Sequence, residues 1–307
     1  MATPIRIGIV GVGLIGGSLA LALRRAGLRT TAPGAVRSTI IGIDLHRASL
    51  LQARRANAID LGFHPDQAPF ASCDLVVLCT PTPALLESLP GIASSMQPGA
   101  LLTDVCGVKE LPCALGAAQR RVVFVGAHPM AGTEQRGFSA ARADLFDGAC
   151  VALCTPAGIA QGNGAWESAA TAAVRALWME AGATRFLELG PSEHDEAVAY
   201  ASHLPALTAA ALFEALEGAG AIEPAARALA AGGFRDTTRL AADGTVGQAA
   251  VHNRFIPAAA RALSEALRNL AEASAQGQRT RDLRPLARRL ELLADRRRAM
   301  PLPARKP

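Results

Sequence analysis

The chain has 307 residues, half of them hydrophobic, and its 31 basic residues exceed its 26 acidic residues to give a formal net charge of +5. This length suggests about two domains, and no uninterrupted apolar run reaches the roughly 18 residues that a membrane span requires. The first predicted strand starts at residue 5, which leaves no room for a signal peptide. We therefore expect a cytoplasmic protein with no membrane partner.

The excess of positive charge lies near the C-terminus, where 12 basic residues stand against 5 acidic ones from Arg261 onward. Over residues 284–298 the arginines alternate with leucines at helical spacing, a pattern typical of an amphipathic helix with a solvated face. The run lacks interleaved aromatic residues, so we expect no nucleic-acid partner.

The six cysteines all precede residue 155, most of them inside apolar runs, and none forms a C-x-x-C pair. This spacing argues against a metal or redox site. We expect buried, reduced thiols, which agrees with the expected cytoplasmic location because disulfides are rare there.

The N-terminal part carries the most informative pattern of the chain. An apolar run at 5–10 meets a glycine-rich turn, and a helical pattern follows. Glycine lets the backbone approach a pyrophosphate, and the next helix offers unpaired N–H groups and a positive dipole end to that anion. The plainer alternative is a tight strand-to-helix turn in some other doubly wound fold. The pattern predicts a dinucleotide held at Gly11, Gly13, Leu14, Ile15 and Gly16.

A second apolar run, at 40–43, ends at Asp44, where a carboxylate would accept hydrogen bonds from an adenosine ribose. Because this acid would repel a 2′-phosphate, we expect NAD rather than NADP as the cofactor. Asp44 lies 28 residues beyond Gly16, against a usual value of about 20 from the motif. Residues 27–39 would absorb the excess as a longer loop.

Further strands are predicted at 75–79, 101–105, 122–127, 149–154 and 184–189, with helical segments between them that include one at 166–181. Thr80 and Pro81 follow the first of these strands, at the sheet edge where ligands bind, and are assigned to the cofactor. The alternation predicts a Rossmann-like, doubly wound parallel α/β domain over residues 1–190. Residues 191–307 show only helical patterns, which predicts an all-α second domain with a helix at 192–217 that Pro205 kinks.

After the predicted strand at 122–127 the chain reads H-P-M-A-G-T-E, from His128 to Glu134. This run resembles the signature of the prephenate and arogenate dehydrogenases, the TyrA family of tyrosine biosynthesis. Three further motifs are similar to that family and occur in the same order: S-H-L-P at 202–205, G-G-F-R-D at 232–236 and T-R-L-A at 238–241. The resemblance covers roughly residues 5–270.

The resemblance implies an oxidative decarboxylation of prephenate to 4-hydroxyphenylpyruvate, in which ring carbon C4 gives a hydride to NAD and the ring carboxylate leaves as CO2. His128 would be the base that takes the proton of the 4-hydroxyl, a role that a reference pKa near 6.5 permits. Arg239 would bind the ring carboxylate through its paired donors. Without the motifs, a structural histidine and a surface ion pair would be the simpler interpretations.

Three further residues are assigned to substrate binding. Lys109 is one of two lysines in the chain, the other being Lys306, which suggests that an ammonium is needed there. His203 is interpreted as a cleft or domain-interface residue, with a purely structural role as the alternative. Glu134 would be a gate or an ion-pair partner in the same cleft, and its alternative is a solvated loop carboxylate.

Two departures from the family pattern bear on the substrate. Gly107 stands where the family commonly has serine, and Ala206 stands where many prephenate enzymes have a second histidine. Arogenate and 4-amino-4-deoxyprephenate therefore stay open as alternative substrates, and a non-catalytic NAD-binding protein is the alternative outside enzymes. A β-hydroxyacid dehydrogenase would require a lysine in the helical domain, and the sequence has none between Glu110 and Arg305.

The helical domain is also expected to bind a second copy of the chain. Segments 209–216 and 256–270 are too apolar for a domain that stands alone, and the family resemblance implies dimerisation through such helices. We therefore predict a homodimer. The chain ends soon after Arg298, so no fused chorismate mutase or regulatory ACT domain is expected.

Overall fold

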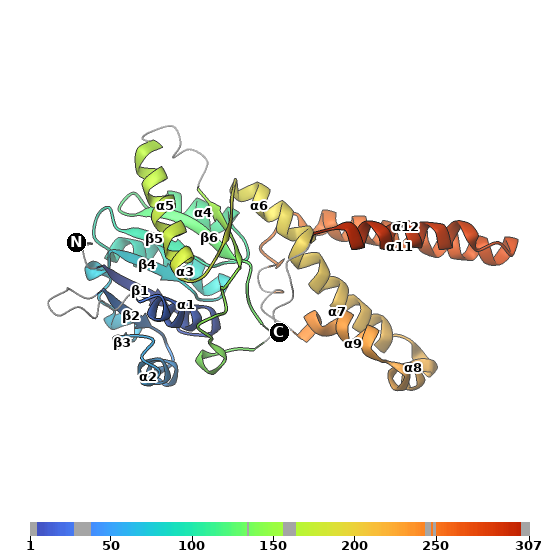
Figure 1. Cartoon of the computed structure of the whole chain (residues 1–307), viewed down its shortest axis with the longest axis horizontal. Coiled ribbons are helices and arrows are strands. Elements are labelled where there is room, and N and C mark those ends of the chain that lie inside the picture. The colour runs from blue at the N-terminus through green and yellow to red at the C-terminus, as the bar shows by residue number, and fades with distance from the viewer. Residues whose placement is uncertain are drawn as a thin grey trace. The chain divides into compact units, whose positions relative to one another are not determined.

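The computed structural model describes residues 5–27, 38–133, 135–155, 164–242, 247 and 250–301, without the side chains of residues 164–168. The chain forms two compact units, Met1–Ile256 and Pro257–Pro307. The first unit contains a sheet with helices packed on it and a run of further helices, and the second contains two long helices (Figure 1).

One sheet of eight strands, in the order β3-β2-β1-β4-β5-β6-β7-β8, organises the first unit (Figure 1). Every neighbouring pair is parallel except β6 and β7, which are antiparallel. The doubly wound, mainly parallel fold predicted from the sequence is therefore confirmed. The strands are β1 (Arg6–Val10), β2 (Thr39–Ile43), β3 (Leu61–Phe63), β4 (Leu75–Leu78), β5 (Leu101–Asp104), β6 (Val123–Pro129), β7 (Cys150–Cys154) and β8 (Arg185–Leu189).

Helices cover both faces of this sheet because its central strands are apolar on both sides. In β4, for example, Val77 belongs to one buried cluster, whereas Val76 and Leu78 belong to another. The first cluster includes side chains of α1, α2 and α5, and the second includes side chains of α3 and α4. These helices are α1 (Leu14–Arg25), α2 (Arg47–Arg55), α3 (Thr82–Ser95), α4 (Glu110–Ala117) and α5 (Gly164–Glu180).

Two details of the sheet differ from the sequence-based expectation. The short strand β3 was not predicted, since its three residues are only partly covered. Strand β6 continues two residues past the predicted end at 127, so His128 lies inside the strand rather than after it. The physical reason is the antiparallel neighbour β7, in which Ala152 and Val151 pair with His128 and Pro129.

The chain after β8 is helical throughout the residues described, as the sequence predicts. The predicted helix at 192–217 is present in three parts: α6 (Pro191–Val198), a π-helical turn (Ala199–His203) and α7 (Leu204–Glu217). The wider π turn lies just before Pro205, where a ring without an N–H cannot continue ordinary α-helical hydrogen bonding. The short helices α8 (Glu223–Leu229) and α9 (Gly232–Thr238) follow, and α9 leads into a 3-10 turn at Arg239–Ala242.

The second unit consists of α11 (Ile256–Thr280) and α12 (Arg284–Ala299). The chain turns between them at Arg281, which adopts a positive φ of 56°. Helix α12 matches the amphipathic helix predicted at 284–298, although its leucines are exposed too: Leu290 by 48%, Leu292 by 59% and Leu293 by 43%. No helix within the described ranges has both the length and the apolar content needed to cross a membrane.

All six cysteines lie in the described residues as free thiols. Four of them are buried, namely Cys73, Cys106, Cys113 and Cys154, and the other two are partly covered. Burial of most of these thiols agrees with the prediction, but only Cys150 and Cys154 lie in a strand, and Cys113 lies in α4. Burial raises the pKa of the Cys73 thiol to about 11, so this side chain behaves as an apolar core residue rather than as a nucleophile.

Candidate active site

The glycine turn between β1 and α1 is built for close approach of backbone segments. Gly11 has φ +89°, and a Cβ atom there would lie 2.8 Å from the carbonyl oxygen of Cys79. A Cβ at Gly16 would lie 2.1 Å from the carbonyl oxygen of Gly11, so α1 packs directly on the turn. The space beside Gly13, the N-cap of α1, is open within 4 Å, and the first turn of α1 contains no acid. This arrangement suits an anion at the helix N-terminus.

Asp44 lies at the end of β2 and reaches the same turn. Its Oδ2 accepts the N–H of Val12 at 2.8 Å, and its Oδ1 accepts the N–H of His46 at 2.7 Å. The carboxylate is half-buried, and its oxygens have lone pairs beyond those used in these two contacts. The part of the predicted 27–39 loop at residues 28–37 lies outside the described residues.

Thr80 and Pro81 also lie beside the glycine turn. A Cβ at Gly11 would be 3.0 Å from the backbone nitrogen of Thr80. The hydroxyl Oγ1 of Thr80 is buried and has no hydrogen-bond partner among the residues described, which is uncommon for a buried polar atom. The structure thus brings Gly11, Gly16, Asp44 and the segment after β4 together at one edge of the sheet.

A second group of polar side chains begins at the end of β5. Asp104 is fully buried, and its oxygens accept the N–H groups of Ala127 at 3.0 Å and Cys106 at 3.0 Å. The ammonium of Lys109, also fully buried, forms an ion pair with the same carboxylate. Burial, the largest single influence, disfavours the charged ammonium, but Asp104 together with smaller effects of Cys106 and Cys113 opposes it, and the pKa of Lys109 is raised. The lysine predicted to bind substrate therefore has an internal partner.

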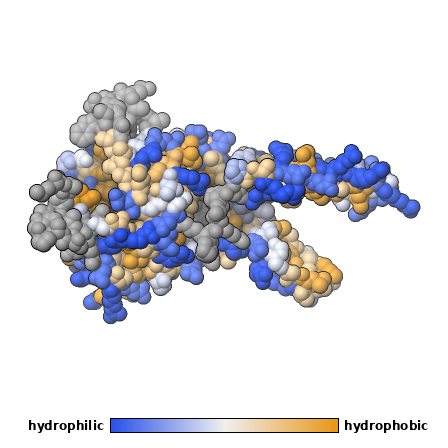
Figure 2. All heavy atoms as spheres, viewed as in Figure 1, coloured by the Kyte–Doolittle hydropathy of each residue, from blue (hydrophilic) through white to orange (hydrophobic). Residues whose placement is uncertain are grey.

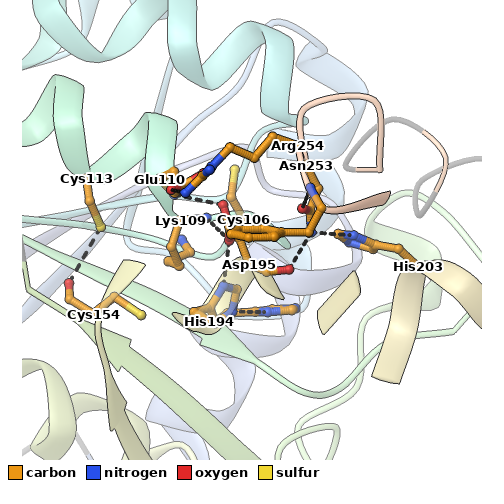
Figure 3. Close-up of polar contacts among 12 residues, drawn as sticks. Cys106, Lys109, Glu110, Cys113, Cys154, His194, Asp195, His203, Asn253 and Arg254 are labelled. Atoms are coloured by element: carbon orange, nitrogen blue, oxygen red, sulfur yellow. Dashed lines mark hydrogen bonds and ion pairs between the residues drawn. The ribbon is translucent and has the colours of Figure 1, made fainter. Parts of the chain in front are cut away.

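Asp195, on α6, ties that helix to the start of α4. Its Oδ1 accepts the N–H of Lys109 at 2.6 Å, and its Oδ2 accepts the N–H of Glu110 at 2.9 Å (Figure 3). A carboxylate in this position caps the helix and interacts favourably with its dipole. Arg254 reinforces the junction by pairing with Glu110 and by donating to Ser192 Oγ at 3.0 Å.

His194 connects this buried carboxylate to His128. Nδ1 of His194 lies 2.8 Å from Oδ1 of Asp195, and Nε2 of His194 lies 2.9 Å from Nδ1 of His128. The two imidazole rings meet edge to face, with centroids 5.1 Å apart and an interplanar angle of 66°. The contacts form a chain rather than a cage: among the described residues, no three His, Cys, Asp or Glu side chains are placed to hold a metal ion.

The environment keeps His128 neutral. Burial, followed by the electrostatic effects of His194, Lys109 and His203, lowers the pKa of His128 well below its ordinary value of 6.5. An imidazole that is neutral at cellular pH has one nitrogen available to accept a proton. The geometry is that of a base whose second ring nitrogen is already engaged.

His203, in the π turn, belongs to the same group of side chains. Its Nδ1 lies 3.1 Å from the amide nitrogen of Asn253, which also donates to the carbonyl oxygen of Asp195 at 2.6 Å (Figure 3). Burial lowers the pKa of His203, partly opposed by Asp195. The histidine is 2% exposed, so it is a buried member of the junction.

Two predicted site residues, Arg239 and Glu134, are not among the residues described in the group of contacts around Asp195. Arg239 is exposed and lies on the 3-10 turn after α9, which packs against α7. Glu134 lies outside the described residues. Of the five predicted catalytic and substrate-binding residues, the structure thus joins His128, Lys109 and His203 through hydrogen bonds with α6 and its neighbours.

Sequence reasoning missed four members of the network: Asp104, His194, Asp195 and Asn253. Asp104 could have been found, because it ends a predicted parallel strand, where functional residues gather. The adjacent pair His194-Asp195 at the start of a helix also offered a signal. Nothing in the sequence indicated Asn253, whose contacts join segments separated by 50 and 58 positions.

Two family models match the chain, the nucleotide-binding domain of prephenate dehydrogenase at residues 19–184 and its dimerization domain at residues 190–276. The chain belongs to the prephenate dehydrogenase family. Its similarity to the prephenate dehydrogenase of Bacillus subtilis is 33% identity over 236 residues, which cover 76% of this chain and 59% of that enzyme. The chain thus spans about three-fifths of that relative's length.

Two further comparisons support this family membership. The cyclohexadienyl dehydrogenase of Zymomonas mobilis is 30% identical over 244 residues, 77% of this chain and 76% of that protein. The crystal structure of prephenate dehydrogenase from Aquifex aeolicus, in complex with hydroxyphenyl propionate and NAD+, superposes with a TM-score of 0.80 at 25% identity. That comparison covers 97% of this chain and 99% of the other.

Proposed function

We propose that this chain catalyses the NAD-dependent oxidative decarboxylation of prephenate to 4-hydroxyphenylpyruvate, with His128 as the base. The observation that carries the proposal is the engaged Nδ1 of His128, 2.9 Å from His194, which leaves Nε2 for the substrate. Family membership supplies the reaction class, since relatives of this chain bear the names prephenate dehydrogenase and cyclohexadienyl dehydrogenase.

The residues around the glycine turn fit the proposed cofactor. The open space at Gly13 and the N–H groups of Leu14 and Ile15 would receive the pyrophosphate, and Asp44 would accept the ribose hydroxyls. The unpartnered hydroxyl of Thr80, followed by Pro81, offers a further polar contact. When bound, NAD supplies the acceptor for the hydride from C4. The related structure from A. aeolicus contains NAD+.

The chemical role of this chain's own residues is to take one proton and to hold the substrate. Nε2 of His128 would accept the proton of the 4-hydroxyl, which a base with a lowered pKa can do at neutral pH. Arg239 is proposed to bind the ring carboxylate, because a planar guanidinium offers paired donors. His203 and Glu134 remain proposed substrate-side residues. For Lys109 we propose a supporting role, since its ammonium is engaged by Asp104.

The same site favours a second candidate substrate, arogenate. Gly107 and Ala206 replace the serine and histidine of the common family pattern, so the pocket lacks two groups expected to contact the prephenate ring hydroxyl and side chain. A relative is also named cyclohexadienyl dehydrogenase. The aminated analogue 4-amino-4-deoxyprephenate is a third substrate of the same class.

We further propose that the protein acts as a cytoplasmic homodimer. Residues 190–276 match a dimerization domain, and several of their apolar side chains are exposed in the single chain. Figure 2 shows hydrophobic residues over α7 and α8. Those on α7 and α8 or between them include Leu212 at 39%, Phe213 at 39%, Ile222 at 63% and Leu229 at 81% exposure. A surface of this kind is typical of an interface.

The test is NADH formation with NAD and, in separate reactions, prephenate, arogenate and 4-amino-4-deoxyprephenate. Turnover of prephenate would support the proposal, and the ratio of kcat/KM values would identify the preferred substrate. Turnover of only one of the other two would move the function to that substrate. If NAD binds by calorimetry but none of the three turns over, the proposed activity is wrong and the non-catalytic alternative replaces it.

A further inference from the structure

A chain of two hydrogen bonds connects His128, the proposed base, to the buried carboxylate of Asp195 through His194. The chain runs from His128 through His194 to Asp195, with separations of 2.9 and 2.8 Å. His194 is 1% exposed and Asp195 is fully buried, so water does not compete for the contact between them. The family motifs in the sequence do not include either residue.

We propose that His194 is a positioning residue for the base: it accepts the Nδ1 proton of His128 and thereby fixes the tautomer in which Nε2 can take the substrate proton. This inference rests on the proposed function, because it assigns a partner to the residue that would perform the proton transfer.

The direction of each hydrogen bond follows from Asp195. Both of its oxygens accept backbone N–H groups, those of Lys109 and Glu110, so the ionised carboxylate is the form that these contacts stabilise. A carboxylate only accepts, and Nδ1 of His194 must therefore donate to it. A neutral His194 then has a bare Nε2, which accepts from Nδ1 of His128. Nε2 of His128 is left with a free lone pair.

The network also fixes the orientation of the rings. Asn253 donates to the carbonyl oxygen of Asp195 at 2.6 Å, and α4 provides the two N–H groups that hold its carboxylate. His194 cannot rotate without losing its hydrogen bond to Asp195 or to His128, which costs free energy for buried polar groups. A rigid orienting partner is what a general base requires, since proton transfer depends on hydrogen-bond geometry.

Several charged or titratable groups act on His128, and His194 is the nearest of them. From α6 come His194 and Asp195, from the start of α4 comes Lys109, and from the π turn comes His203. Burial is the largest of the influences that lower the pKa of His128. A neutral His194 acts on His128 through the hydrogen bond between the two rings.

The experiment compares His194→Ala and His194→Gln with the wild-type chain. We expect kcat to fall about 10- to 100-fold in His194→Ala, short of the upper part of the 10²- to 10⁴-fold range for loss of a general base, with KM for NAD unchanged. The glutamine variant should recover part of kcat, because its amide oxygen can accept the Nδ1 proton. His64→Gln is the matched control, since His64 is exposed, paired with Asp66 and outside this network.

A second readout does not require turnover. In ¹⁵N-labelled protein near neutral pH, the ring of His128 should show a protonated Nδ1 and a bare Nε2, and His194→Ala should abolish that preference. An inactive wild-type chain that shows this tautomer would contradict the proposed function but not the positioning role. Wild-type kcat in His194→Ala, or a bare Nδ1 in His128, would overturn the inference.

Discussion

At the scale of single residues, the proposed chemistry depends on a histidine that stays neutral. His128 occupies a strand end where burial and nearby histidine and lysine side chains lower its pKa well below 6.5. A base is active only in its neutral form, so activity should be lost as the pH falls through the lowered pKa and retained above it.

The first prediction concerns the pH profile and the loss of this base. The acidic limb of kcat/KM should lie below pH 6.5 in the wild-type chain. His128→Asn should reduce kcat by about 10²- to 10⁴-fold, because the proton acceptor is lost, with little change in NAD affinity. Steady-state kinetics and calorimetric titration with NAD would measure the two quantities. An Asn variant with unaltered kcat would remove His128 from the mechanism.

The second prediction concerns Arg239. Arg239→Gln should raise KM for the substrate about 10- to 100-fold, since hydrogen bonds to charged groups contribute roughly 1.5 to 3 kcal/mol, and kcat should change less. Arg175→Gln is a suitable control, because Arg175 forms a surface ion pair with Glu188. An unchanged KM in the Arg239 variant would place the carboxylate anchor at another residue.

At the scale of elements, the buried pair of Lys109 and Asp104 links the end of β5 to the start of α4. Both side chains are fully buried, and neither can reach water if its partner is removed. A lone buried charge is costly, whereas loss of both charges is tolerated much better.

The third prediction follows from this pair. Lys109→Met should lower the free energy of unfolding by about 3 to 5 kcal/mol, and Asp104→Asn in the same chain should restore part of it. Urea unfolding followed by circular dichroism would provide both values. If Lys109→Met were as stable as the wild-type chain, the supporting role assigned to this lysine would be wrong.

The elements themselves were largely predictable, and the junctions between them were not. Apolar runs and Gly/Pro breaks located β1, β2, β4, β5, β7 and β8 to within a few residues, and the sequence also predicted the helical character of the chain after β8. The end of β6 was misplaced because it depends on pairing with β7, a contact between distant segments. The same limit hid the role of Asp195, whose partners Lys109 and Glu110 lie 86 and 85 positions away. Local sequence patterns carry no information about contacts between residues that lie so far apart in the chain.

At the scale of the whole molecule, the exposed apolar side chains of the helical part are consistent with binding to a second copy of the chain. Leu267 on α11 is 56% exposed, and Leu212 and Phe213 on α7 are each 39% exposed. The sequence predicted this apolar excess at 209–216 and 256–270, and the match to a dimerization domain agrees with it.

The fourth prediction is the molecular mass in solution. Light scattering during gel filtration should give twice the single-chain mass of 31.6 kDa. Phe213→Glu should shift the population toward the single chain, because a charge on a buried interface is costly. Leu187→Glu, at an exposed position of the edge strand β8, should leave the mass unchanged. A wild-type mass of 31.6 kDa would contradict the proposed dimer.

The carboxylate of Asp195 binds two different elements of the fold. It holds the first N–H groups of α4 and, at the same time, the imidazole of His194. A movement that separates α6 from α4 would therefore release the N-terminus of α4 and would also take His194 away from His128, the proposed base. The contact between these two helices thus couples the helical segment after β8 to the proposed base on β6.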